Sequence, residues 1–148
     1  MFLHQQQSGR VMSNEIQELQ RIAHKWTVIF LEENLPNLSK VRGGNWWGKC
    51  VLYYFNDWQE KMVVAQNISK LGNLDLATNL LIFDKNWYHL EKHLELSRVK
   101  RNLLFELRDI RNELAHEDTH GVPLIDQIRH ADTFSRYLDF IGADANAV

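Results

Sequence analysis

The chain has 148 residues, of which 45% are hydrophobic and 24% are charged. A chain of this length and composition forms one domain around a hydrophobic core, which excludes a wholly disordered protein. Lys and Arg number 17 against 19 Asp and Glu, and this near balance excludes binding of nucleic acid through bulk positive charge. The single cysteine, Cys50, excludes an internal disulfide framework and a zinc site built from cysteines.

The ends of the chain and its apolar runs bear on location and domain organisation. No run approaches the roughly 18 apolar residues that a membrane span needs. The N-terminal sequence also lacks the basic and apolar segments of a signal peptide. We therefore expect a soluble cytoplasmic protein without a membrane partner. Residues 1–12 are polar and Gln-rich and predict a flexible tail, residues 13–142 predict the folded domain, and residues 143–148 predict a C-terminal tail.

Apolar residues recur every three or four positions in the first two thirds of the chain, which predicts helices. The first helix is expected to begin at Asn14, which with Gln17 resembles a capping box, and to end near Pro36. A second pattern covers residues 47–62, where clustered aromatic and β-branched residues leave a strand as the alternative. Asp75 is the expected cap of a third helix, which continues after a kink through residues 86–94.

The last third of the chain has the clearest periodicity. Ser97 is expected to cap a helix over residues 98–116, whose apolar stripe is Val99, Leu103, Leu107, Ile110 and Leu114. Pro123 is expected in the first turn of a last helix, whose stripe is Ile125, Ile128, Ala131, Phe134, Leu138 and Ile141. The sum is an all-α fold, a compact bundle of about five helices.

The helix over residues 98–116 also has an unusual polar face. Arg108, Asn112 and His116 are each four positions apart and form one row opposite the apolar stripe. Close to this row or on its flanks lie Arg101, Phe105, Arg111 and Ala115. Two interpretations stay open: a solvated face with one stray Phe, or an interface with a second copy of the chain that has polar chemistry at its centre.

The side chains of this face suit the attack of an RNA 2′-hydroxyl on the adjacent phosphate. His116 would transfer protons near neutral pH, and Arg111 would stabilise charge on the phosphoryl oxygens. Asn112 would orient a hydroxyl or a phosphate. The scheme needs no metal and no cofactor. The alternative role for His116 is that of a C-terminal helix residue that interacts favourably with the helix dipole.

The segment Arg111-Asn112-Glu113-Leu114-Ala115-His116 resembles the R-x4–6-H signature of HEPN domains (higher eukaryotes and prokaryotes nucleotide-binding). Residues 74–87 and 96–112 are similar to the HEPN subgroup found beside the nuclease domain of a eukaryotic messenger-RNA surveillance endoribonuclease and in bacterial defence proteins. The resemblance implies a helical bundle that dimerises through its signature helices. It also implies a composite, metal-independent ribonuclease site made of Arg111 and His116 from both chains, with Asn112 beside them.

We therefore expect a homodimer that cleaves RNA, in which Arg108 and Arg101 bind the RNA and Phe105 and Ala115 lie at the dimer interface. A role as a toxin or defence effector would bring an antitoxin or another partner protein. The alternative is a non-catalytic HEPN module that dimerises or binds RNA, a nucleotide or a partner protein. His89 and His93 have metal-ligand spacing, but an exposed polar face is the favoured interpretation of that pair.

Overall fold

The computed structural model describes residues 2–116 and 121–143, with side chains described from residue 15 onward. Over these residues it contains seven α-helices and no strand, which confirms the all-α class. The helices are α1 (Phe2–Asn34), α2 (Trp46–Cys50), α3 (Asp57–Ala65), α4 (Leu76–Lys85), α5 (Trp87–Leu94), α6 (Arg101–Ala115) and α7 (Leu124–Phe140). Short 3-10 turns cover residues 35–37, 39–41, 52–54, 71–73 and 98–100.

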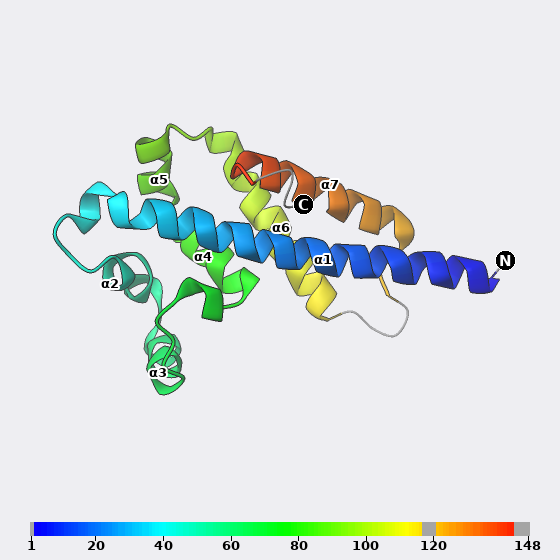
Figure 1. The fold of residues 1–148 in the computed structure, drawn as a ribbon, viewed down its shortest axis with the longest axis horizontal. Helices are drawn as coiled ribbons and strands as arrows, with labels where there is room; N and C mark the ends of the chain where they lie inside the picture. The colour runs from blue at the N-terminus through cyan, green and yellow to red at the C-terminus, as the bar shows by residue number, and fades with distance from the viewer. Residues whose placement is uncertain (1, 117–120, 144–148) are drawn as a thin grey trace.

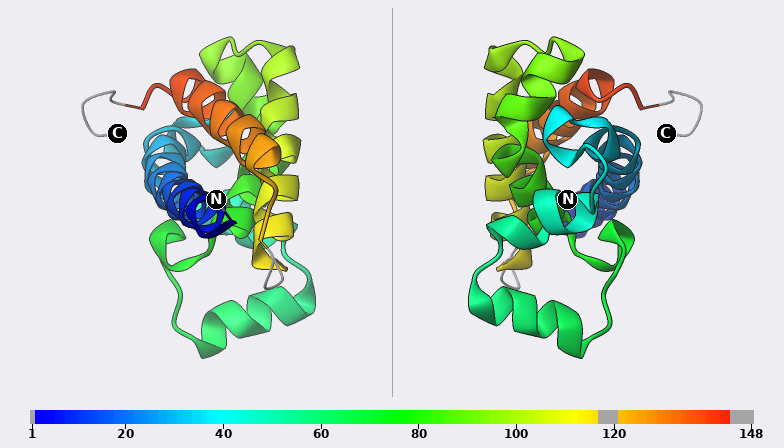
Figure 2. Two further views of the ribbon diagram at one scale, coloured as in Figure 1. Left: turned by 90° about the vertical axis from the view of Figure 1, so that its right-hand side faces the viewer. Right: turned by 90° about the vertical axis from the view of Figure 1, so that its left-hand side faces the viewer.

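Four helices make the body of the molecule. The longest, α1, crosses the whole bundle and packs beside α7 and α4, while α6 packs against α4 and α7 (Figure 1). Each of the four therefore contacts two others, and together they close a ring around the core. The two views along the bundle show α3 as an arm that projects away from this body (Figure 2).

The core between these helices is built from large apolar side chains. Phe83 of α4 is fully buried and stacks on Phe30 of α1 at a ring-centroid distance of 5.0 Å. Trp87 stacks on Phe83 at 5.7 Å and lies 6.0 Å from Phe140 of α7. These contacts join α1, α4, α5 and α7 at one end of the bundle. Aromatic pairs of this kind add about 0.5–1.5 kcal/mol each beyond the burial of their area.

The helix count exceeds the expected five because two predicted helices are divided. The pattern over residues 47–62 breaks at Phe55, which is extended, and α3 begins after Asn56. Asn56 and Gln59 form a capping box, which favours a new helix start over continuation. The expected kink after α4 falls at Asn86, whose side chain donates to the carbonyls of Cys50 and Ile82.

Two expected helix starts are wrong. Helix α1 begins at Phe2 and not at Asn14, because residues 2–13 contain no proline and the single Gly9 is tolerated. The division of residues 1–12 from the domain as a flexible tail stays a prediction, and of the C-terminal tail 143–148 only residue 143 lies within the described residues. Ser97 makes no capping bond and precedes a 3-10 turn, so α6 begins only at Arg101.

The apolar stripes are confirmed where the helices face the ring and wrong at their N-terminal ends. Leu103, Leu107 and Ile110 are buried, whereas Val99 lies in the 3-10 turn before α6 and is 74% exposed. In α7, Phe134 and Leu138 are buried, but the first turns carry the exposed Leu124, Ile125 and Ile128. Helix α7 therefore presents an apolar surface at its beginning.

Candidate functional site

The candidate site lies on the second half of α6, where the predicted residues divide between two directions. Arg108 is half-buried, and Asn112 and His116 are exposed, so the row predicted from their spacing lies on the outer side of the helix. Arg111 points instead toward α4. Five positions separate Arg111 from His116, which corresponds to roughly 140° around an ideal helix. One chain thus presents the two side chains in different directions.

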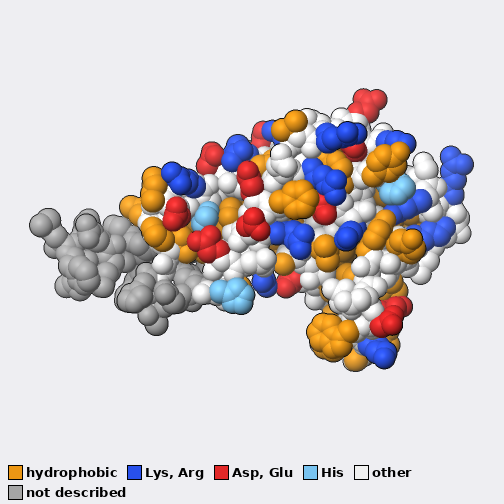
Figure 3. Space-filling view, turned by 180° about the vertical axis from the view of Figure 1, so that it is seen from behind, with side chains coloured by type: hydrophobic (Ala, Val, Ile, Leu, Met, Phe, Trp, Pro, Cys, Tyr) orange, Lys and Arg blue, Asp and Glu red, His pale blue; other side chains and the backbone are white. Residues whose placement is uncertain are grey.

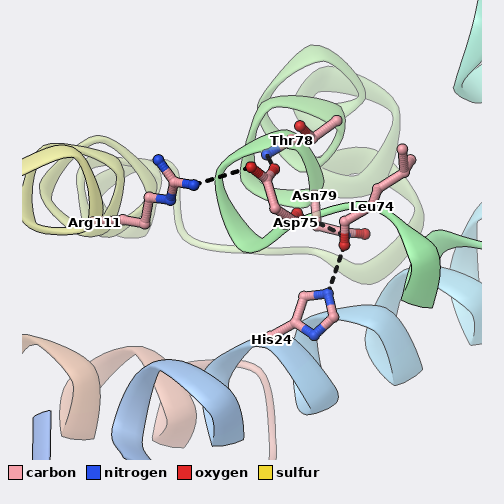
Figure 4. A network of polar contacts seen from close by, with 6 residues as sticks. All are labelled: His24, Leu74, Asp75, Thr78, Asn79 and Arg111. Carbon is pink, nitrogen blue, oxygen red and sulfur yellow. Dashed lines mark hydrogen bonds and ion pairs between the residues drawn. The ribbon is translucent and has the colours of Figure 1, made fainter. Parts of the chain in front are cut away.

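Arg111 is held by an ion pair with the first residue before α4. Its Nη2 lies 3.1 Å from Oδ2 of Asp75, and the other carboxylate oxygen of Asp75 accepts a hydrogen bond from the backbone N–H of Thr78 at 2.8 Å (Figure 4). Asp75 thereby serves as the helix cap that the sequence predicts, a confirmed expectation. The Arg111 side chain is 30% exposed, so part of this side chain remains accessible to a ligand.

Asp75 is itself fixed by the packing of neighbouring segments. The buried Asn79 amide lies within hydrogen-bond distance of the carbonyls of Leu71, Leu74 and Asp75, which ties the turn before α4 to that helix. A ring nitrogen of His24 on α1 donates to the Leu74 carbonyl at 2.7 Å (Figure 4). The guanidinium of Arg111 is therefore positioned by a network that reaches α1, α4 and α6.

The charge state of Asp75 agrees with this role. Partial burial raises the pKa of Asp75, but hydrogen bonds from Thr78 and the positive charges of Arg111 and His24 outweigh it. The net result is a pKa below the ordinary value, so the carboxylate stays ionised at neutral pH. The pair of Asp75 and Arg111 is then a true ion pair.

His116 ends α6. Its backbone N–H bonds to the carbonyls of Asn112 and Glu113, and its side chain is exposed. The neighbouring Glu113 turns to α7, where its carboxylate lies 3.5 Å from Nε2 of His130. Glu113 therefore faces the α6–α7 contact, which draws its negative charge toward the bundle. Among the described residues, the imidazole of His116 has no hydrogen-bond or ion-pair partner, so it can meet a partner from outside.

The other expected site residues differ in their availability. Arg101 is engaged: its Nε donates to Asp84 at 2.7 Å, and its guanidinium lies 5.7 Å from the ring centre of Phe105. Arg108 makes no ion pair with any described residue. Phe105 is 42% exposed and Ala115 is exposed, so both are accessible to a second chain. Their roles in RNA binding and dimerisation stay predictions.

A pocket of about 200 Å³ adjoins Arg111 between α1, α6 and the start of α7. Gln17 and Gln20 of α1 line one side, Arg111 and Ala115 line another, and Gln127 of α7 closes it. Nothing in the sequence predicts this pocket, because its lining comes from three separate parts of the chain. The same holds for the contact of Asp75 with Arg111, since the sequence gives only the capping role of Asp75.

The surface charge agrees with the near-neutral composition. On the face turned away from the viewer of Figure 1, basic side chains are more frequent in the right half of the view and acidic side chains in the left half (Figure 3). Over the described residues, no three His, Cys, Asp or Glu side chains are grouped closely enough to hold a metal ion. In the same part of the chain, no helix has both the length and the apolar character needed to cross a membrane.

The fold and the site together define an all-α domain with an Arg and His signature at the end of a bundle helix. Residues 28–142 match the family model of the Swt1-like HEPN domain, about three quarters of the chain. The chain therefore belongs to the Swt1-like HEPN family, which confirms the resemblance found in the sequence. No curated protein and no solved structure matches the chain.

Proposed function

We propose that this chain is a metal-independent endoribonuclease that acts in the cytoplasm as a homodimer. The observation that carries the proposal is the arrangement at α6, with Arg111 held by Asp75 and His116 exposed just after the helix end. Arg111 supplies a fixed positive charge for phosphate, and His116 supplies an imidazole, which can accept and donate a proton. Membership of the HEPN superfamily supports this chemistry.

The reaction follows from these two groups. The imidazole of His116 in one protomer accepts the proton of the RNA 2′-hydroxyl, whose oxygen attacks the adjacent phosphorus. The bond from phosphorus to the 5′-oxygen breaks, and that oxygen takes a proton from solvent water, to which the imidazole of His116 later returns the proton it accepted. The products are a 2′,3′-cyclic phosphate and a free 5′-hydroxyl. Arg111 stabilises the negative charge that builds up on the phosphoryl oxygens, and Asn112 orients the phosphate.

A second copy of the chain is part of the proposal because one α6 presents Arg111 and His116 in different directions. Two copies that meet across the outer side of α6 bring an Arg from one chain to a His from the other. The exposed Phe105 and Ala115 lie on this side and supply apolar contact area. Exposed apolar side chains next to polar ones are typical of an interface between proteins.

The rival is a non-catalytic module that uses the same face to dimerise or to bind a partner protein. The exposed Leu124, Ile125 and Ile128 at the start of α7 favour an interaction role, with or without catalysis. A toxin or defence role, and an antitoxin as partner, follow only from the resemblance and stay predictions.

One experiment separates the enzyme from the module. Purified protein is incubated with mixed RNA in EDTA, together with Arg111→Ala and His116→Ala. Arg98→Ala and His93→Ala are matched controls, since both residues are exposed and lie outside the site. The proposal predicts cleavage by the wild type and both controls, with loss of roughly 100-fold to 10,000-fold in the two site variants. Absence of cleavage by the wild type, or cleavage unchanged in both site variants, contradicts it.

A further inference from the structure

One continuous stretch of the chain carries positive charge and no negative charge. Residues 34–56 contain Lys40, Arg42 and Lys49 but no Asp or Glu. This stretch leaves the end of α1, includes α2 and ends at the cap of α3. Among the described residues, none of these three basic side chains has an ion-pair partner. Their charge is therefore not balanced by a carboxylate in contact with them.

The neighbouring helices do not supply the missing negative charge. Helix α2 contains no acidic residue, and α4 and α5 contain one each. In α4, Asp84 accepts a hydrogen bond from Arg101, and in α5, Glu91 lies 3.1 Å from Nε of Arg98. Both carboxylates are thus already paired with an arginine. No carboxylate of α2, α4 or α5 is left to neutralise the lysines.

Lys40 joins this stretch to the junction of α4 and α5. Its Nζ donates to the side-chain oxygen of Asn86 at 2.7 Å and to the hydroxyl of Tyr54 at 2.8 Å. Both acceptors are neutral, so they satisfy donors of the ammonium group without cancelling its charge. Lys49 approaches from α2, and its Nζ donates to the Lys40 carbonyl at 3.2 Å. Two positive charges are therefore held close together by neutral partners.

Open aromatic rings lie beside these lysines. Tyr53 is 77% exposed and meets the ring of Tyr54 edge-on, with ring centres 5.0 Å apart. On α5, Tyr88 is 57% exposed, and Nζ of Lys92 lies 4.3 Å from the centre of its ring. Tyrosine is ordinarily at least half-buried in a folded domain, so two rings this open are available to a ligand.

The electrostatics of His89 indicate that both groups of residues belong to one surface. The pKa of His89 is lowered, first by partial burial and then by the positive charges of Lys40 and Lys92. Charges shift a pKa appreciably only over short distances, so the lysine of the first group and the lysine of α5 both lie near this imidazole. A bound anion would offset the repulsion among these groups.

This surface is remote from the signature residues. Helix α5 leads through a 3-10 turn to the start of α6, whose 15 residues rise by about 22 Å before Arg111 and His116 end the other side of the helix. The half of Figure 3 in which basic side chains are more frequent is the end of the molecule at which α2 and α5 lie. The cleavage scheme leaves this positive charge unused.

Lysines beside open rings suit a single strand of nucleic acid. The lysines attract backbone phosphates, and the rings stack on unpaired bases. A duplex keeps its bases stacked inside and cannot use the rings. A membrane-binding face carries large apolar side chains beside its lysines. Here the open rings end in hydroxyl groups, and the exposed Leu124, Ile125 and Ile128 lie at the start of α7, at the other end of the bundle (Figure 1).

We infer that this lysine–tyrosine surface is an accessory binding site for single-stranded RNA, made of Lys40, Lys49, Tyr53, Tyr54, Tyr88 and Lys92. The lysines bind phosphates of the strand, and the exposed rings of Tyr53 and Tyr88 stack on its bases. The choice of RNA as the strand rests on the proposed function. The surface holds the RNA at a distance from the bond that is cut, so it contributes affinity without taking part in the reaction.

The test measures binding without cleavage. The probes are fluorescent 2′-O-methyl decanucleotides, because a methylated 2′-oxygen cannot attack the phosphate, and affinity is read from anisotropy at several salt concentrations. Tyr53→Leu and Tyr88→Leu are each expected to weaken binding about five-fold without changing the salt slope, through loss of stacking. Lys49→Gln with Lys92→Gln is expected to lower the salt slope by roughly 0.7 to 1 per lysine.

Matched controls replace the same kinds of side chain elsewhere. Trp58→Leu removes an exposed ring from the projecting helix α3, and Lys25→Gln removes an exposed lysine from α1. Both are expected to bind the probe as the wild type does. All the substituted positions are exposed, so the fold is expected to persist, and circular dichroism checks this. Wild-type affinity in both tyrosine variants, or equal losses in the surface variants and their controls, overturns the inference.

Other ligands of a basic surface are separate arms of the test. A duplex of the same sequence and poly-glutamate are expected to bind more weakly than the single strand, and tighter binding of either overturns the single strand as the ligand. Vesicles that contain phosphatidylserine are expected to bind no better than neutral vesicles. Strong binding to the anionic vesicles that is retained in Tyr88→Leu would identify a membrane surface and overturn the inference.

Cleavage of mixed RNA in EDTA is scored separately. The tyrosine variants are expected to raise KM and to leave kcat unchanged, because the surface binds the strand away from the reacting phosphate. Loss of probe binding in these variants, together with a wild type that never cleaves, contradicts the proposed nuclease and leaves the surface in place. Cleavage by the wild type, together with unchanged binding in the variants, contradicts the surface alone.

Discussion

Arg111 and Asp75 lie 36 positions apart in the chain and form an ion pair in which Nη2 and Oδ2 are 3.1 Å apart. The same carboxylate caps α4 through Thr78. One side chain therefore fixes both the start of a core helix and the direction of the arginine in the HEPN signature. Substitutions of Asp75 can separate the role of this carboxylate in stability from its role in positioning Arg111.

The first prediction concerns Asp75→Asn. An Asn side chain still caps a helix, so we expect a change in unfolding free energy of less than about 1 kcal/mol, as judged by urea denaturation. The charge that holds Arg111 is lost, and we expect RNA cleavage to fall by roughly ten-fold to a hundred-fold through misplacement of the guanidinium. Asp57→Asn, at an exposed Asp in α3, is the control. Unchanged cleavage in Asp75→Asn would show that Asp75 serves only as a cap.

The second prediction follows from the lowered pKa of Asp75. Because its pKa is lower in the folded chain than in the unfolded chain, Asp75 stabilises the fold above its ordinary pKa of about 4. This contribution is lost as pH falls through the lowered folded value. We expect the difference in unfolding free energy between wild type and Asp75→Asn to shrink from pH 5 to pH 3. A difference that stays constant over this range contradicts the ion pair.

A third prediction concerns the buried hydroxyl pair between α1 and α7. Tyr137 is fully buried, and its hydroxyl oxygen lies 2.6 Å from Oγ1 of Thr27. We expect Tyr137→Phe to lower the unfolding free energy by about 1 kcal/mol at pH 7, because Thr27 loses its partner. Thr27→Val tests the pair from the other side. No loss of stability in either variant would show that the pair contributes nothing.

The same pair predicts a response to alkali. Burial raises the pKa of the Tyr137 phenol, and the hydrogen bond with Thr27 only partly offsets this. A group whose pKa is raised on folding stabilises the fold below its ordinary pKa, here about 10, and this contribution is lost as pH rises further. Between pH 9 and pH 11 the wild type is therefore expected to lose more stability than Tyr137→Phe. Equal losses would contradict the raised pKa.

The fifth prediction separates two arginines that the sequence places together. Arg108 has no ion-pair partner among the described residues, so we expect Arg108→Gln to weaken RNA binding and to lower the salt slope by about one. Arg101 is paired with Asp84, whose side chain is only 11% exposed. We expect Arg101→Gln mainly to destabilise the fold, by about 1–3 kcal/mol. Equal effects of both variants on the salt slope would contradict this division.

The fold class follows from the sequence because apolar spacing of three and four governs which residues of a helix meet the core. That spacing does not mark helix ends, as α1 and α3 show. Asn14 and Asn56 both precede a Gln by three positions, and only Asn56 caps a helix. The difference lies in the flanking backbone, which is extended at Phe55 and helical before Asn14.

The candidate site, like the fold, could be predicted from the sequence only in part. The row of Arg108, Asn112 and His116 follows from helical geometry within one segment, so its position on the outer face is predictable. Contacts between segments are not. The partner of Arg111 and the lining of the pocket depend on how α1, α4 and α7 pack against α6, and no local pattern in a single sequence encodes those distances.

If Arg111 of one chain and His116 of another act on the same phosphate, two inactive variants should restore cleavage when they are mixed. Arg111→Ala and His116→Ala are purified separately, mixed, dissociated and reassociated, and assayed for RNA cleavage in EDTA. Only a mixed dimer contains an intact Arg and an intact His in different chains. We expect each variant alone to be inactive and the mixture to regain cleavage. If the wild type cleaves RNA and the mixed dimers do not, the result contradicts a site shared between two chains.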